Sequence, residues 1–372
     1  MNIKVITRHT PSNYGSLLQS IATVNTIESL GHHCEIIDYR RLDEIGLSGV
    51  LTQLNGKTGY DNPLKRLVYI AVRYPIEKFA QKKFERMRAK YLSMTQRCIS
   101  HEDLKHLSAD AFMTGSDQVW GPMMNGNYDS AYFLQFVETK SLKLAYAASF
   151  GKTKFTEATM ADYKKMLSSY DKIAVRESSA VTLLKEWGIG NCLGQVLDPT
   201  LLLTKNEWKR LLVREIDNKK YTGKKYILVY QIHNDPKLSD YANRIAKYAG
   251  IELLRVNPYY HQRFRGGKFI CCPDLSEFLT LIDHASCIVT DSFHGTCFAI
   301  NFGKQFIEIL PNNATGTRNQ SILELTGLSN RILHDFNDYS LVDKMIDYDR
   351  VDEILKRERV KSIQVMKDLL DM

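Results

Sequence analysis

The chain has 372 residues, of which 44% are hydrophobic and 25% charged, as is typical of a globular protein of about two domains. Its net charge is +8, but nine basic residues and two acids between positions 63 and 90 supply +7 of it, which excludes a nucleic-acid-binding surface spread over the protein. Seven scattered cysteines without a Cys-x-x-Cys pair argue against a zinc site and indicate reduced thiols in the cytoplasm.

Residues 1–8 predict a strand, so we expect no signal peptide, and no apolar run is long enough to span a bilayer. A turn-rich loop over 10–16, a helix over 17–30 and a strand over 35–39 follow. This order predicts a right-handed βαβ unit, in which ligands bind at the carboxyl ends of the strands. The loop lacks Gly-x-Gly-x-x-Gly, so a bound dinucleotide is not supported.

Residues 42–62 contain four glycines and no clear period, which predicts a loop. In the basic segment 63–90, Pro75 starts a helix or kinks a longer one, and an apolar stripe from Ile76 to Tyr91 lies among the lysines and arginines. One interpretation is a solvated charged face over a packed stripe. The other is a helix that lies on an anionic membrane surface.

A buried strand over 109–114 leads into the loop 115–122, which holds Asp117 and Trp120. Asp117 is a candidate acid, base or hydroxyl anchor, and Trp120 is a candidate for stacking on a sugar ring. The alternative is a turn, with Asp117 accepting backbone N–H bonds and Trp120 in the core. A strand over 143–151 and another over 173–176 follow; Arg176 at the tip of the latter binds a carboxylate or phosphate, or forms a salt bridge to Glu177 or another acid.

After a strand over 196–201, a fresh α/β pattern begins: strands at 226–230 and 251–256 and helices at 205–220, 240–248 and 275–285. We therefore expect two doubly wound, Rossmann-like α/β domains that face a cleft, with boundaries at 1–204 and 205–372. The first carries the basic segment 63–90, and the second ends in an amphipathic helix over 351–370.

The stretch 287–300 reads as strand, polar loop and helix. Asp291, Ser292 and His294 lie in the loop, and Gly295 and Thr296 place backbone N–H groups at a helix N-terminus, where anions bind. The alternative is a helix cap with His294 packed in the core. A strand over 304–309 and a polar loop over 310–319 follow, in which Arg318 is either a second anion ligand or a surface residue.

Six motifs stand in the order typical of the polysaccharide pyruvyl transferase family, which the chain resembles from about residue 10 to about residue 330. They are Asn13-Tyr14-Gly15 with Gln19, Gly115-Ser116-Asp117-Gln118-Val119-Trp120, the run 145–151, Val175-Arg176-Glu177, Asp198-Pro199-Thr200 and Asp291-Ser292-Phe293-His294-Gly295. The resemblance implies a fold like the GT-B glycosyltransferases and transfer of pyruvate from phosphoenolpyruvate to a sugar as a ketal. One departure is Ser292, where many members of the family have an arginine.

On this basis we assign site residues by role. His294 is expected to bind the donor or act as the acid, and Asp117 to act as base or hydroxyl anchor. The donor is expected to contact Arg176, Ser292, Gly295, Thr296 and Arg318; the acceptor is expected to contact Asn13, Tyr14, Gln19 and Trp120. No metal or cofactor is required if arginines and backbone N–H groups balance the donor's charge.

Two other functions stay open. A GT-B glycosyltransferase with a nucleotide-sugar donor would use the same cleft, and a non-catalytic glycan-binding relative would account for the missing arginine. The acceptor is expected to be a sugar of a cell-surface polysaccharide or exopolysaccharide, or its lipid-linked oligosaccharide precursor. The protein is then cytoplasmic, with segment 63–90 as a contact to the inner membrane face, and nucleic acid is not an expected partner.

Overall fold

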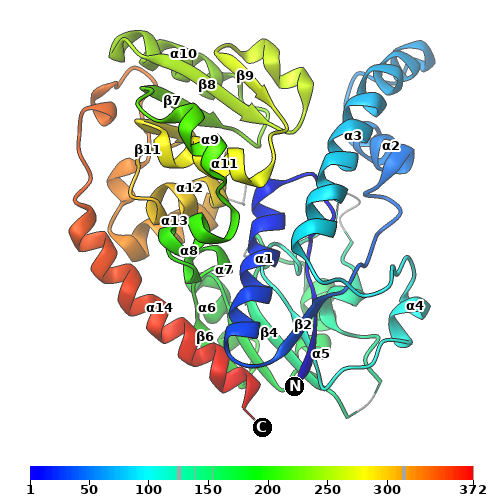
Figure 1. The fold of residues 1–372 in the computed structure, drawn as a ribbon. Helices are drawn as coiled ribbons and strands as arrows, with labels where there is room; N and C mark the ends of the chain where they lie inside the picture. The colour runs from blue at the N-terminus through cyan, green and yellow to red at the C-terminus, as the bar shows by residue number, and fades with distance from the viewer. Residues whose placement is uncertain (124–126, 139, 153, 312–315, 372) are drawn as a thin grey trace. The chain divides into compact units, whose positions relative to one another are not determined.

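The computed structural model describes residues 1–123, 127–138, 140–152, 154–311 and 316–371. The chain divides into two compact units (Figure 1), unit 1 with Met1–Leu202 and Glu358–Met372, and unit 2 with Leu203–Arg357. Each unit is a parallel β-sheet with helices, so the expected class of two doubly wound α/β units is confirmed.

Unit 1 is built on a six-stranded sheet in the order β2-β1-β3-β4-β5-β6, and every neighbouring pair is parallel. Its strands are β1 (Asn2–Ile6), β2 (His33–Ile36), β3 (Ala111–Thr114), β4 (Leu142–Ala148), β5 (Lys172–Val175) and β6 (Cys192–Gln195). Because β2 and β3 flank β1 on opposite sides, the winding of the sheet reverses between β1 and β3. Ligands of open α/β sheets bind at such a switch point.

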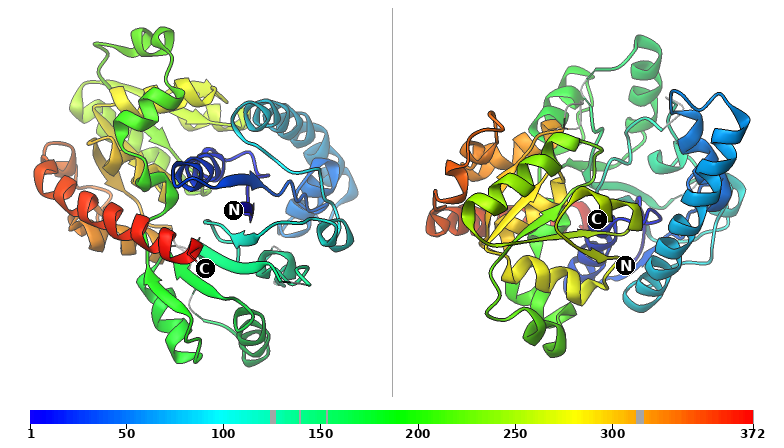
Figure 2. Two further views of the ribbon diagram at one scale, coloured as in Figure 1. Left: turned by 60° about the horizontal axis from the view of Figure 1, so that its bottom comes forward. Right: turned by 90° about the horizontal axis from the view of Figure 1, so that it is seen from above.

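The helices of unit 1 are α1 (Tyr14–Ser29), α2 (Gly46–Asn55), α3 (Pro63–Tyr91), α4 (His101–Lys105), α5 (Glu157–Leu167), α6 (Ser178–Glu186) and α7 (Pro199–Leu202). Strands β3 to β5 carry buried apolar side chains that pack with aromatic residues from other segments of unit 1, among them Phe133, Phe150 and, on α5, Tyr163. α2 and α3 lie side by side, blue to cyan in both views of Figure 2.

Unit 2 has a five-stranded parallel sheet in the order β11-β10-β7-β8-β9. Its strands are β7 (Tyr226–Tyr230), β8 (Glu252–Asn257), β9 (Lys268–Cys271), β10 (Cys287–Thr290) and β11 (Gln305–Glu308). Its helices are α8 (Lys205–Leu212), α9 (Glu215–Tyr221), α10 (Pro236–Ala249), α11 (Leu275–His284), α12 (Phe293–Asn301) and α13 (Gly316–Thr326). Here the winding reverses between β7 and β10.

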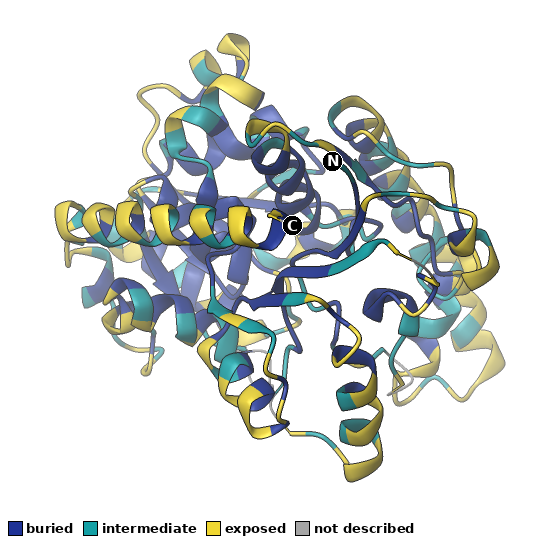
Figure 3. Ribbon diagram, turned by 90° about the horizontal axis from the view of Figure 1, so that it is seen from below, coloured by how far each residue is buried: buried dark blue, intermediate teal, exposed yellow. Residues whose placement is uncertain are grey.

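The last helix, α14 (Tyr348–Leu370), begins in unit 2 and ends in unit 1. Its exposed and buried residues alternate along its length (Figure 3), as its amphipathic sequence predicts. From the sequence, we expect the whole helix to belong to the second domain. The structure instead groups Glu358–Met372 with unit 1, where Lys172 Nζ donates to the carbonyl of Asp368 and the Ser362 hydroxyl accepts from the Leu197 N–H.

Two other local predictions differ from the structure. The predicted loop over 42–62 contains α2, because Val50 and Leu54 are buried against the rest of unit 1 despite the surrounding glycines. The strand expected over 196–201 lies earlier, as β6, and α7 begins at Pro199. Of the two interpretations of Pro75, the structure excludes a helix start and places Pro75 inside the longer, 29-residue α3.

Candidate functional site

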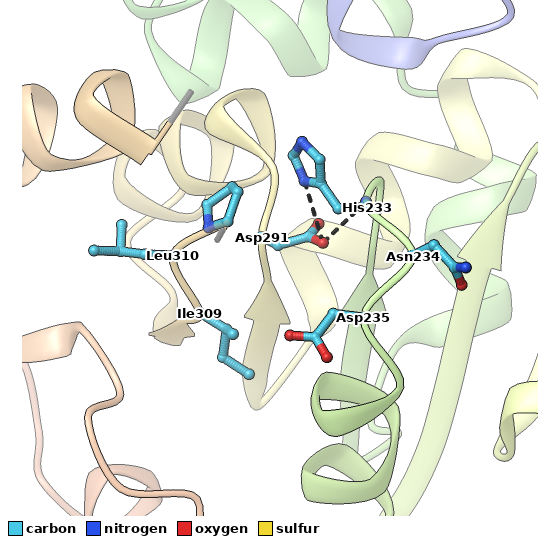
Figure 4. A pocket seen from close by; sticks show the side chains of 7 residues that line it. His233, Asn234, Asp235, Asp291, Ile309 and Leu310 are labelled. Atoms are coloured by element: carbon cyan, nitrogen blue, oxygen red, sulfur yellow. Dashed lines mark hydrogen bonds and ion pairs between the residues drawn. The ribbon is translucent and has the colours of Figure 1, made fainter. Parts of the chain in front are cut away.

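A pocket with several polar lining residues lies at the switch point of unit 2. Its volume is about 330 Å³, and it is lined by the residues that follow β7, β10 and β11: His233, Asn234, Asp235, Asp291, Ile309, Leu310 and Pro311 (Figure 4). The β7 loop runs into α10 and the β10 loop into α12, so two helix N-termini begin at this pocket. Helix N-termini favour anions.

Asp291 joins the two central loops of this pocket. Its Oδ1 accepts a hydrogen bond from the Ile232 N–H at 2.7 Å and its Oδ2 accepts one from the His233 N–H at 3.0 Å. The Nδ1 of His233 lies 3.4 Å from the same Oδ2. Asp291 is only 2% exposed, so this buried carboxylate holds the β7 loop and sets the position of the His233 ring.

Two arginines add positive charge behind the β7 loop. Burial and the neighbouring charge of Arg265 lower the pKa of Arg255 to about 10, and the charge of Asp291 opposes this shift. Arg265 donates to the side chain of Asn234, a pocket residue, and burial lowers its pKa as well, against the charges of Asp291 and Asp235. The negative charge of Asp291 is therefore balanced locally, and an anion at the helix N-termini would meet cations as well as this carboxylate.

The start of α12 corrects part of the donor assignment. Ser292 is the N-cap, and its hydroxyl accepts the Gly295 N–H at 3.2 Å. The Thr296 N–H donates to the Ser292 carbonyl within the helix. Both N–H groups are thus used by the helix, so Gly295 and Thr296 do not present them to a ligand, and Ser292 acts as the cap that the sequence offered as the alternative.

Gly295 has a packing reason to be glycine. A Cβ at this position would lie 2.4 Å from Thr290 Oγ1 and 3.0 Å from a ring carbon of Tyr230. The first turn of α12 therefore lies so close to β7 and β10 that no residue with a Cβ fits at position 295 without a shift of its neighbours. His294, in the same turn, is 6% exposed and its ring centroid lies 5.2 Å from that of Phe293; among the described residues it is not one of those lining the pocket.

A buried carboxyl group, Glu308, lies at the end of β11 beneath this turn. Burial raises the pKa of Glu308 to about 8, and hydrogen bonds from Thr296 and Asn319 oppose the shift. The Thr296 hydroxyl has one proton but two acceptors, the Ser292 carbonyl at 3.0 Å and Glu308 Oε2. A protonated Glu308 that donates to Thr296 resolves this shortage of protons, and both facts indicate a neutral carboxyl at pH 7.

Arg318 is brought to the same helix start. It lies on the first turn of α13, with its guanidinium 5.7 Å from the centroid of the Phe293 ring. Asn319 beside it donates to Glu308 at 2.6 Å, which ties α13 to the α12–β11 core. The predicted loop 310–319 otherwise includes 312–315, which lie outside the described residues. Arg318 and the His294 turn thus share one corner of unit 2.

The switch point of unit 1 holds Asp117. The Ser16 hydroxyl, on the first turn of α1, donates to Asp117 Oδ2 at 2.7 Å. The φ of Asp117 is +80°, in the left-handed region that favours glycine, and its carbonyl accepts the N–H groups of Val119 and Ser149. The half-buried Asp117 is both a turn residue, since its Oδ1 accepts the Gln118 N–H at 2.8 Å, and a candidate for chemistry because of its strained conformation at a switch point.

Arg176 lies beside this loop in a network of buried ion pairs. Its guanidinium donates to Asp198 at 2.9 Å, to Glu177 at 3.0 Å and to the Ser116 hydroxyl at 3.2 Å. Burial would lower the pKa of Arg176, but the charges of Glu177, Asp198 and Asp117 raise it above its usual value. The structure therefore places Arg176 in the buried salt bridge that the sequence offered as the alternative to a donor contact.

The four residues assigned to the acceptor serve the fold in this structure. Asn13 caps α1, the buried Tyr14 ring packs 5.1 Å from Phe84, and the buried Gln19 amide donates to Thr7. Trp120 is 0% exposed, stacks with Phe133 and donates its indole N–H to the Tyr132 carbonyl. A sugar has no access to the Trp120 ring, because the loop carries it into the aromatic core.

Three residues of interest carried no role in the sequence interpretation: His233, Asp235 and Glu308. The signal for the first two is the run Gln231-Ile232-His233-Asn234-Asp235 directly after β7, which is polar except for Ile232 and stands at the position equivalent to the loop after β1. Glu308 could not be found in this way, because its burial depends on packing between α12 and α13. In the described part of the chain, no group of three His, Cys, Asp or Glu side chains is arranged to hold a metal ion, and no helix is long and apolar enough to cross a membrane.

Two parallel α/β units with polar loops at their switch points define a GT-B-like protein. Solved structures support this class. The chain matches the UDP-GlcNAc 2-epimerase of Methanocaldococcus jannaschii with a TM-score of 0.53 and 13% identity, over 100% of this chain and 99% of that one. It matches the enzyme of the same name from Neisseria meningitidis with a TM-score of 0.52 and 12% identity, over 100% and 99%.

Family membership follows from the match of the sequence to a protein-family model. The model of the polysaccharide pyruvyl transferase family matches residues 13–313, and the chain belongs to this family of transferases. No curated protein matches the chain.

Proposed function

We propose that the protein transfers the pyruvyl group of phosphoenolpyruvate to two hydroxyl groups of one sugar in a cell-surface polysaccharide or its lipid-linked precursor. The observation that carries the proposal is family membership over residues 13–313 together with the unit 2 pocket, which stands where open α/β sheets bind ligands. Phosphoenolpyruvate carries a phosphate and a carboxylate, whose charges Arg265 and Arg318 balance in this proposal, while His233 lines the pocket.

The chemistry balances without a redox step. The methylene carbon of phosphoenolpyruvate takes a proton, and the first sugar hydroxyl adds to the neighbouring carbon. The second hydroxyl of the same sugar then displaces phosphate from that carbon and closes the ketal ring. Of the two hydroxyl protons released, one replaces the proton consumed at the methylene carbon and the other leaves with phosphate.

Unit 2 is assigned the donor and unit 1 the acceptor. His294 is assigned to donor binding or to protonation of the methylene carbon, since an imidazole exchanges protons near neutral pH. Asp117 is assigned to the hydroxyl proton, because it is half-buried, acidic and held by Ser16 at the unit 1 switch point. Because Ser292 caps α12 in place of an arginine, Arg318 and the His233 side chain hold the donor in this proposal.

The test is phosphate release from phosphoenolpyruvate across a panel of galactose- and mannose-type acceptors. We expect His294→Gln to lower turnover by roughly a hundredfold or more while the melting temperature changes little. His284→Gln, a half-buried histidine of α11 that bonds to Asn218, is the matched control and should keep full activity. An active His294→Gln variant would contradict the assignment.

A nucleotide-sugar donor is the second candidate, favoured by the fold shared with epimerases solved with UDP-GlcNAc. A thermal-shift screen of phosphoenolpyruvate against uridine nucleotides separates the two. Stabilisation by the nucleotide alone, with no phosphate released from phosphoenolpyruvate, would replace the first proposal. Glycan binding with neither donor would indicate a non-catalytic relative.

A further inference from the structure

One face of α3 in unit 1 is exposed along the whole helix, and its N-terminal half is apolar. Leu64, Leu67, Val68, Val72 and Phe79 all lie on it, with Leu64 69% and Val72 60% exposed. The spacing of these residues places them on one stripe of a helix, and the stripe extends over about 22 Å. Exposed apolar residues scattered singly need no explanation, but a contiguous row of this length on a soluble unit does.

The C-terminal half of the same face is basic. Lys78, Lys82, Arg86 and Lys90 are exposed, and among the described residues none of these four forms an ion pair. They continue the direction of the apolar stripe, so that the face changes from apolar to cationic once, near Phe79.

Both acids of α3 are turned away from this face. The buried Glu77 pairs with Arg73 at 2.6 Å, and Glu85 pairs with Arg40 and, at 3.2 Å, with Arg88. The inward stripe, with Ala80, Phe84 and Met87, is buried in unit 1. The packed stripe that the sequence predicts therefore exists, but Phe79 is not part of it, and a second apolar stripe faces outward.

We propose that this face of α3 is a docking surface for an anionic lipid bilayer, with the apolar half in the interfacial region and the basic half on the headgroups. The charge of the surface is complementary to acidic phospholipids, and the apolar stripe beside it supplies the burial that pure electrostatic adsorption lacks. A helix that lies in the interface needs this combination and no membrane-spanning length.

The C-terminal end of α3 is fixed to the loop that follows β1, at the switch-point edge of unit 1. Arg88 Nη1 donates to the carbonyls of His9 at 3.1 Å and Thr10 at 3.2 Å, in the loop that follows β1. Arg40 links Glu85 to Asp38, which in turn lies 3.2 Å from the His9 ring. A bilayer held by α3 thus lies at a fixed place relative to the β1 loop, whichever substrate unit 1 binds.

The experiment is flotation of the full chain with vesicles, in low and high salt. We expect binding to vesicles of phosphatidylcholine mixed with phosphatidylglycerol, no binding to phosphatidylcholine alone, and weakening by salt. Lys78→Glu/Lys82→Glu/Arg86→Glu should bind roughly tenfold or more weakly. The matched control is Lys356→Glu/Lys361→Glu/Lys367→Glu on α14, which changes the net charge equally and should bind as the wild type does.

The apolar half is tested separately. Leu64→Ser/Val68→Ser/Val72→Ser should also lose roughly tenfold in binding, because each side chain contributes by burial in the interface. Ile216→Ser/Phe264→Ser/Val360→Ser, at isolated exposed positions, is the control. No binding by the wild type, or equal loss in the α14 control, overturns the proposal. So does a dimer in light scattering that the Leu64 variant dissociates while vesicle binding stays unchanged, which would identify the face as an interface between two copies.

Discussion

The two switch points of the molecule share an aspartate that binds a preceding segment of the chain, but they differ in the charges and the open space around it. In each, an aspartate after one strand accepts hydrogen bonds from the loop or helix after the unit's first strand: Asp117 from Ser16 in unit 1, and Asp291 from Ile232 and His233 in unit 2. Beside Asp117, the guanidinium of Arg176 is already paired with the carboxylates of Asp198 and Glu177. Around Asp291 a pocket of about 330 Å³ stays open beside two helix N-termini.

The comparison distinguishes charged residues that hold a loop in position from charged residues that can bind a ligand. A network of buried ion pairs holds a loop in place but attracts an anionic ligand less, because the positive charge of Arg176 already has the counter-ions Asp198 and Glu177. The unit 2 pocket is lined by two carboxylates, Asp235 and Asp291, and the Asp291 carboxylate is held by backbone N–H groups, so His233 and the nearby arginines are the groups left to interact with an anionic ligand. This difference is the reason why the proposal places the donor in unit 2, whereas Arg176, which the sequence assigned to the donor, is paired with Asp198 and Glu177 in unit 1.

The strongest way to break the unit 1 network is Arg176→Met. Removing one partner of a buried ion pair leaves Asp198 and Glu177 uncompensated, and we expect a loss of about 3–5 kcal/mol in the free energy of unfolding of unit 1. Urea denaturation measures it. Adding Asp198→Asn should recover part of the loss, and calorimetry should show unchanged donor affinity; weakened donor binding in a folded variant would restore Arg176 to the donor site.

Asp291→Asn tests unit 2 in the same way. An amide keeps the shape but loses the charge; its oxygen can accept from one of the Ile232 and His233 N–H groups, but its NH2 group then faces the other, so the β7 loop should move. We expect phosphate release to fall by roughly a hundredfold, equal to about 2.7 kcal/mol. Asp240→Asn, at an exposed position of α10, is the control. A variant with normal turnover would show that the pocket does not hold the donor.

Gly295→Ala probes the close contact beneath the pocket. Its methyl group must push away Thr290 Oγ1 or the Tyr230 ring, and we expect a loss of roughly 2 kcal/mol in the free energy of unfolding together with lower turnover. Gly190→Ala, with no atom within 4 Å of the added Cβ, should be neutral. Equal melting curves for the two variants would mean that α12 adjusts without strain.

Glu308→Gln should change only the pH dependence. Because the folded pKa of about 8 lies above the ordinary glutamate value, the stability is fully present below about pH 4.5 and falls as pH rises toward 8, by at most about 1.4 kcal/mol per pH unit. Glutamine stays neutral and can donate to Thr296, so its melting temperature should not show this decline. Parallel melting curves across pH 5–9 in both proteins would contradict a protonated Glu308.

Several features of this protein follow from its sequence alone. Local and periodic signals predict the strand, loop and helix around Asp291 and the strand over 226–230, and the structure has β10, α12 and β7 at these positions. The change of pattern near residue 204 lies close to the division between the two units at Leu202 and Leu203. The family motifs also indicate the GT-B-like class, which the solved structures share.

Tertiary packing decided the rest. Trp120 and Arg176 are residue types that bind sugars and phosphates as readily as they pack or pair, and only the aromatic core and the Asp198 carboxylate settle their positions. The helix α2 forms in a glycine-containing segment because Val50 and Leu54 have a surface to bury against. Periodicity indicates which residues share a face, but whether that face meets a core, a ligand or solvent depends on partners distant in the chain, and this is why the outward stripe of α3 and the neutral Glu308 appear only in the folded protein.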